Sequence, residues 1–157
     1  MNKKLSLIFI SAFMIACHTL FAQAAYKPKT AVQLKSVLMK NYSLPTDAKV
    51  ILVGNIKNDA ENNYQVAQVI RYWSMPYSKI KHPRYDLVVF EEDSVIGCYS
   101  HFIEEKPLVK NNKLTFAKIA ADKGNEIDFS EGVPLMAKIA GEIYNFEPVD
   151  FTKAADE

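Results

Sequence analysis

The fold is decided by the stretch DLVVFEEDSVIGCYSHFI, which runs from Asp86 to Ile103. Two apolar, β-branched and aromatic runs lie at its ends, and each has the length of a strand. The polar triplet Glu92-Asp93-Ser94 between them is typical of a tight turn. The stretch therefore predicts an antiparallel β-hairpin, with strands over 86–91 and 95–103.

The sequence before this hairpin predicts a helix followed by a second hairpin. Thr30 is a suitable N-cap, and Pro45 ends the helical region because the residue before a proline avoids the helical conformation. The turn cluster between Asn58 and Asn63 separates two apolar runs. The expected elements are a helix over 30–42, strands over 49–56 and 64–73, and an irregular loop over 74–84.

The sequence after the first hairpin predicts shorter strands, with elements expected over 107–109, 113–117 and 126–129. The segment 133–146 fits two interpretations. Pro134 suits the first turn of a helix, whereas Gly141 costs about 1 kcal/mol inside one. We favour two short strands broken at Ala140-Gly141 and keep the helix as the alternative.

Strands at short spacing with polar turns are typical of an antiparallel sheet. The predicted fold class is α+β, mainly β. One N-terminal helix is followed by a curled antiparallel sheet, in the form of a small barrel or a sandwich.

The N-terminal residues predict an export signal. Lys3 and Lys4 precede an apolar run over 5–21, and the run ends in Ala22-Gln23-Ala24. A positive start, an apolar middle and an A-x-A site are the parts of a signal peptide. We therefore expect a signal peptide over 1–24, cleavage between Ala24 and Ala25, and a periplasmic or secreted product.

Two alternatives remain for this N-terminal segment. The tetrapeptide ending at Cys17 partly matches a lipobox, in which Cys17 is acylated and the protein becomes a membrane-anchored lipoprotein. An uncleaved anchor needs about 20 apolar residues, and this run is shorter.

The segment after the signal, 25–157, has the length of a single globular domain, with a mobile leader over 25–29 and a mobile tail over 152–157. Loss of Lys3 and Lys4 leaves 17 basic against 18 acidic residues. This balance gives no reason to expect a nucleic-acid partner. We also expect no transmembrane helix in the mature chain, no metal site and no cofactor.

The string around Cys98 offers the weak catalytic candidates Cys98, His82 and His101. Alternation along a strand places Cys98 on the face of Ile96, Ser100 and Phe102 and places His101 on the other face. Cys98 is therefore expected to be a buried core thiol. A catalytic role would need His82 from the preceding loop as its base.

The loop before the hairpin of residues 86–103 is the best candidate for a contact surface. Its cationic groups suit phosphate or carboxylate, and its aromatic rings can stack on sugars or bases. The alternative is a solvated connection. The candidate binding residues are Trp73, Tyr77, Lys79, Lys81, His82, Arg84 and Tyr85.

These features favour a small exported protein that binds a partner without catalysis. The partner is expected to be an envelope protein, a secreted enzyme that it inhibits, or a polysaccharide. The alternatives are a small exported hydrolase or transferase with Cys98 as nucleophile, a lipoprotein held by Cys17, and a dimer joined through Cys98. The sequence leaves the oligomeric state open.

Overall fold

The computed structural model describes residues 26–74, 77–92 and 94–152. The predicted signal peptide, its cleavage residues Ala22, Ala24 and Ala25, and the alternative lipidation site Cys17 lie outside these residues. So does the predicted tail beyond Thr152.

The described part of the chain holds one α-helix, a short 3-10 helix and nine strands. In chain order they are α2 (Ala31–Tyr42), β1 (Lys49–Lys57), β2 (Asn63–Trp73), β3 (His82–Glu91), β4 (Ser94–Phe102), β5 (Leu108–Lys110), β6 (Lys113–Thr115), η1 (Ala121–Lys123), β7 (Glu126–Asp128), β8 (Met136–Ile139) and β9 (Glu142–Glu147). The predicted hairpins and the N-terminal helix are therefore confirmed.

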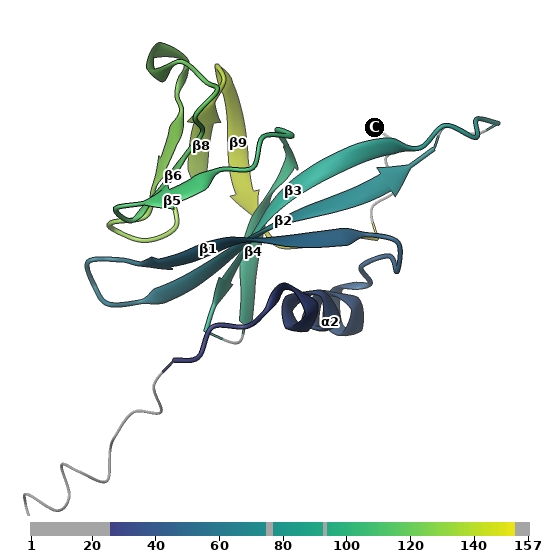
Figure 1. Cartoon of the computed structure of the whole chain (residues 1–157), viewed down its shortest axis with the longest axis horizontal. Helices are drawn as coiled ribbons and strands as arrows, with labels where there is room; N and C mark the ends of the chain where they lie inside the picture. Colours follow the sequence, from purple (N-terminus) through teal and green to yellow (C-terminus); the bar gives the residue numbers. More distant parts are fainter. Residues whose placement is uncertain (1–25, 75–76, 93, 153–157) are drawn as a thin grey trace, which may run out of the picture.

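The strands form two antiparallel sheets. The larger sheet has the order β1-β2-β3-β4-β9-β8, and the smaller has the order β5-β6-β7. Figure 1 shows α2 on one side of the long strands and β5 to β9 on the other side. The α+β, mainly β class is confirmed. The barrel form is wrong, because β1 and β8 stand at opposite ends of the larger sheet instead of pairing with each other.

Helix α2 begins at a capping box. The Gln33 backbone N–H donates to the Thr30 hydroxyl, and the Gln33 side chain accepts from the Thr30 backbone N–H. Leu34 and Leu38, four residues apart, are the buried residues of the helix. Val32, near the start of the helix, is 79% exposed. One leucine stripe therefore fixes the helix on the sheet.

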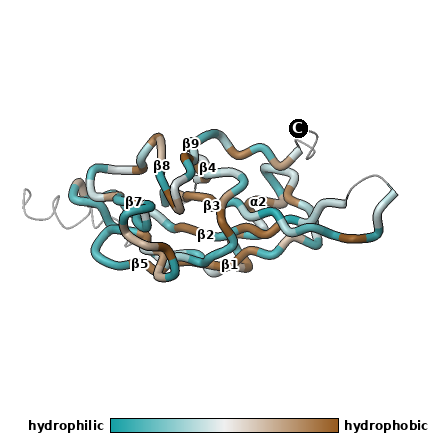
Figure 2. Tube along the Cα trace, turned by 90° about the horizontal axis from the view of Figure 1, so that it is seen from above, coloured by the Kyte–Doolittle hydropathy of each residue, from teal (hydrophilic) through white to brown (hydrophobic). Residues whose placement is uncertain are grey.

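The two faces of the central strands bury two separate cores. The helix-side core contains Leu34, Leu38, Leu44, Ala48, Ala67, Val69, Val88, Phe90, Cys98 and Phe151. The core on the other face is larger and richer in aromatic residues, including Tyr64, Tyr99, Phe102, Phe116, Phe129 and Tyr144. Figure 2 shows hydrophobic stretches along the strands in the middle of the molecule. Full burial of each large apolar side chain contributes roughly 1.5–3 kcal/mol.

Segment 133–146 consists of strands, as we favoured, and not of a helix. β8 and β9 pair directly, with Ile139 opposite Glu142. Ala140 and Gly141 form the turn between them, with φ of 56° and 90°. Two positive φ values are what a two-residue hairpin turn needs, so this glycine sits where the turn requires it.

Two bulges in β4 correct the predicted alternation of its faces. Tyr85 pairs with Phe102 but Leu87 pairs with Tyr99, so β4 carries one extra residue there. Phe102 consequently packs in the same core as Tyr99 and not in the core of Cys98. A second register shift lies between Gly97 and Val95, at Ile96, which is 37% exposed. A bulge reverses the side-chain alternation beyond it.

The ends of the predicted loop and leader also differ from expectation. Strand β3 begins at His82, so the irregular connection after Trp73 is shorter than predicted.

The leader is hydrogen-bonded to the sheet. The backbone N–H of Lys29 donates to the Gln65 side-chain oxygen at 2.9 Å, and the Gln65 amide nitrogen donates to the Lys29 carbonyl at 3.0 Å. Buried Gln65 therefore joins the leader to β2.

Candidate functional site

The β2–β3 hairpin reaches beyond the rest of the sheet at its outer end (Figure 1). Its connection carries Tyr77, which is fully exposed, and Ile80, which is 66% exposed. Lys79 between them is exposed too. Figure 2 shows a hydrophobic stretch within this projecting loop. We call Tyr77, Lys79 and Ile80 the hairpin tip.

The backbone of the tip is held locally. The Ile80 backbone N–H donates to the Ser78 hydroxyl at 3.1 Å, a side-chain turn that serine commonly makes. Tyr77 has φ of 69°, which is uncommon for a residue with a side chain. The tip therefore presents an aromatic ring, a cation and a branched aliphatic group from a defined turn.

Two contacts lie at the base of the hairpin end. The rings of Trp73 and His82, opposite each other on β2 and β3, have centroids 5.1 Å apart. Lys81 Nζ lies 2.8 Å from the Asp47 carboxylate. The hydrogen bond between them lowers the pKa of Asp47 and raises the pKa of Lys81. The ring contact joins the two strands of the hairpin, and the exposed ion pair links Lys81 to the segment between α2 and β1. Trp73, Lys81 and His82 therefore already have partners within the protein.

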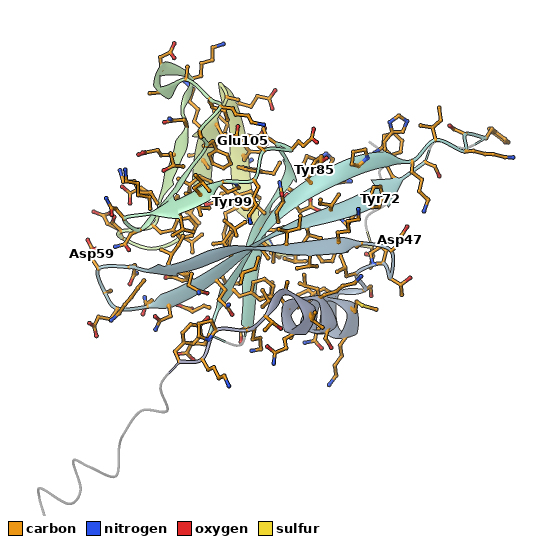
Figure 3. All side chains as sticks on the ribbon, in the orientation of Figure 1. Asp47, Asp59, Tyr72, Tyr85, Tyr99 and Glu105 are labelled. Carbon is orange, nitrogen blue, oxygen red and sulfur yellow. The ribbon has the colours of Figure 1, made fainter. Side chains whose placement is uncertain are left out.

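The remaining predicted binding residues lie on the sheet, on opposite faces. Tyr85 is half-buried, and burial followed by nearby Glu104 raises its pKa. Figure 3 shows Tyr85 on β3 next to Tyr72 on β2, in the outer half of the hairpin. Arg84, one residue earlier on the strand, contacts the His101 ring. The seven predicted residues therefore do not form one surface.

Arg84 belongs to a charged cluster at the end of the helix-side core. Arg71 Nε donates to Asp86 Oδ2 at 2.7 Å, and both side chains are almost completely buried. The ring of Phe151 lies 4.9 Å from the Arg71 guanidinium carbon, a cation–π contact. This ion pair could be found from the sequence only through the register of the hairpin, which pairs Arg71 with Arg84 and Val69 with Asp86 and so places Arg71 and Asp86 on one face.

His101 lies at the exposed side of this cluster. Its backbone N–H donates to Asp86 Oδ1 at 3.3 Å, and its Nε2 contacts Arg84 Nη2. Partial desolvation, and then the charge of Arg84, lower the pKa of His101. Both effects disfavour the protonated form of the imidazole.

Cys98 is buried, as predicted, and its surroundings disfavour a nucleophile. Its Sγ lies 3.4 Å from Ser100 Oγ. Burial raises the pKa of the thiol to about 11, whereas a nucleophilic cysteine needs a lowered pKa. Cys98 pairs with Val88, and His82 is six residues from Val88 along β3, about 20 Å at the rise of a strand. His82 is therefore too far away to act as its base.

Other concave or charged regions offer weaker sites. A polar cleft of about 760 Å³ lies between the leader and the turns of the two hairpins, and it is lined by Tyr26, Lys57, Ala60, Glu61, Asn62, Asn63, Glu91, Glu92 and Ser94. Among the described residues, no three His, Cys, Asp or Glu side chains gather to hold a metal ion. The helices of residues 26–74, 77–92 and 94–152 are also too short or too polar to cross a bilayer.

The fold and these sites define an α+β, mainly β protein that exposes an aromatic and an aliphatic side chain at the tip of one hairpin. Comparison with known protein families, curated proteins and solved structures finds no match to this chain. The function must therefore be argued from its own residues.

Proposed function

We propose that this chain is a non-catalytic binding protein that contacts a partner protein through the hairpin tip. The observation that carries the proposal is the exposure of Tyr77 and Ile80 at the projecting end of the β2–β3 hairpin (Figure 1). Exposed aromatic and aliphatic groups gain free energy when a partner surface covers them. Tyrosine is also among the residues enriched at binding hot spots.

The chemistry of the tip favours a protein over a polysaccharide. Ile80 contributes branched apolar surface, which gains free energy when an apolar pocket covers it. Sugars are bound chiefly by aromatic faces and hydrogen-bonding groups, and Ile80 has neither. Lys79 adds a cation beside the apolar pair, so the complementary surface is an apolar pocket with an acidic rim.

The proposal also assigns the protein to the periplasm or the extracellular space. The signal pattern of residues 1–24 supports this location. Intact-mass measurement of the protein from its producing cell tests it. A chain beginning at Ala25 supports a free exported protein, acylated Cys17 supports a membrane-anchored one, and a chain that keeps residues 1–24 in the cytoplasm contradicts export.

Site-specific photo-crosslinking in the producing cell tests the partner class. A benzophenone amino acid at Tyr77 is expected to give a discrete adduct that contains a second protein. The matched control is the same probe at Val32, which is exposed on α2 away from the tip. A glycan adduct at Tyr77 would favour the polysaccharide class, and equal adducts from both positions would contradict the proposal.

A further inference from the structure

The charged cluster at the end of the helix-side core contains two guanidinium groups and one buried carboxylate. Asp86 Oδ2 accepts from Arg71 Nε at 2.7 Å, and Asp86 Oδ1 accepts from the His101 backbone N–H at 3.3 Å. Both oxygens of this carboxylate are therefore engaged by groups other than Arg84. Asp86 still attracts the charge of Arg84, but Arg71 and His101 take the hydrogen bonds of its two oxygens.

Arg84 has a poor set of partners for a half-buried cation. Its Nη2 contacts His101 Nε2, and its buried Nε has no hydrogen-bond partner among the described residues. Nε and Nη2 form the edge of a guanidinium that binds a carboxylate or a phosphate with two parallel hydrogen bonds. In Arg84 only the Nη2 end of this edge contacts a partner, the imidazole nitrogen of His101. A buried donor left without an acceptor costs free energy, and a bound ion is one of the usual reasons for such a group.

We propose that Arg84 binds an oxyanion, either a phosphate or a carboxylate, at a site that the His101 ring covers. The His101 ring occupies the position that the oxyanion takes, and its exposed side chain turns aside when the anion binds. Arg84 then donates through Nε and Nη2. The inference is independent of the hairpin tip, because it uses neither Tyr77 nor Ile80.

The neighbours of the site limit what can bind. Phe151 covers the Arg71 guanidinium, so an anion approaches from the side of Arg84 and His101. The charged groups that influence His101 are Arg84, Asp86, Arg71 and Glu147. Glu147, exposed on β9 opposite Cys98, also attracts Arg84. This carboxylate competes with an external anion.

Titration of the full exported chain, followed by NMR of the His101 ring, tests the site. The probes are inorganic phosphate and a capped tetraglutamate peptide, at constant ionic strength. We expect a saturable shift with a Kd on the order of 1 mM for at least one probe. Saturation by phosphate alone indicates a free anion as ligand, and tighter binding of the peptide indicates an acidic protein segment.

Four variants make the test specific. Arg84→Gln is expected to abolish the saturable shift, whereas Lys110→Gln, which removes one cation from β5 in the other sheet, leaves it unchanged. Glu147→Gln is expected to tighten binding about threefold by removing the competing carboxylate. If Arg84→Gln fails to fold, Arg84→Lys keeps the charge and is expected to weaken binding by losing the paired donors. An NMR shift that grows linearly with anion concentration in the wild type would overturn the inference. An unchanged Kd in Arg84→Gln and Arg84→Lys would overturn it as well.

Discussion

The inner half and the outer end of the β2–β3 hairpin differ sharply. In the inner half, Val66, Leu87 and Val89 are completely buried between neighbouring strands and a second layer. At the outer end, Tyr77 and Ile80 face solvent. The same pair of strands thus supplies core at one end and free contact surface at the other. The difference indicates that substitutions in the inner half act on folding and those at the tip act on binding.

The largest effect on stability is expected for Asp86→Ala. The change leaves buried Arg71 without its carboxylate, and breaking a buried ion pair costs about 3–5 kcal/mol. Urea unfolding of the purified protein measures the loss. The matched control is the double variant Arg71→Met with Asp86→Leu, which removes both charges and should be closer to the wild type. A loss under about 1 kcal/mol for Asp86→Ala would contradict burial of the pair.

Cys98, opposite the inner half of β3, is expected to resist iodoacetamide until the protein unfolds. Burial shields the sulfur, and a pKa of about 11 keeps the thiol protonated at neutral pH. Labelling in native buffer should be at least about a hundredfold slower than in denaturant, because it requires opening of the core. Mass spectrometry of the labelled protein gives both rates. Rapid native labelling would revive Cys98 as a candidate nucleophile.

Trp73→Ala, at the boundary between the two regions, should have an intermediate effect. The substitution removes the ring contact with His82 and is expected to lower the free energy of unfolding by about 1 kcal/mol. Trp73→Phe keeps an aromatic ring and is expected to lose less. Urea midpoints of the two variants check this order, and a larger loss for the phenylalanine variant would count against the ring contact.

A smaller, pH-dependent effect is expected from His101. Its pKa is lowered from 6.5 in the folded protein, so the unfolded chain binds the proton more readily. The resulting contribution to stability is present above pH 6.5 and is lost as the pH falls through the folded pKa. Urea unfolding between pH 7.5 and 5.5 is therefore expected to show a steeper decline for the wild type than for His101→Gln. If the wild type and His101→Gln lose stability equally as the pH falls, His101 does not contribute to the pH dependence.

The parts of the fold that depend on local signals could be predicted from the sequence. The capping box at Thr30 and the turn at Ala140-Gly141 involve residues close together in the chain, so their types suffice. The same holds for the polar turn that starts at Glu92. Strand pairing over short loops then follows from the hairpin rule.

The parts that depend on register and closure could not be predicted. The extra residue near His101 reverses the faces of β4, and it has no local signature in the sequence. The barrel alternative failed because closure depends on how the two edge strands of the sheet meet. For the candidate site, the loop was identified, but Arg84 and Tyr85 were grouped with the tip because β3 was expected to begin later.

The most direct test of the account combines binding and stability in one protein. The photo-crosslinking residue is placed at Lys79, and the adduct yield is compared with and without the changes Tyr77→Ser and Ile80→Ser. Loss of two contact residues at the centre of an interface is expected to lower the yield at least about tenfold, while the urea midpoint stays unchanged. An unchanged adduct yield, or a yield that falls only together with the urea midpoint, would contradict a binding role for the hairpin tip.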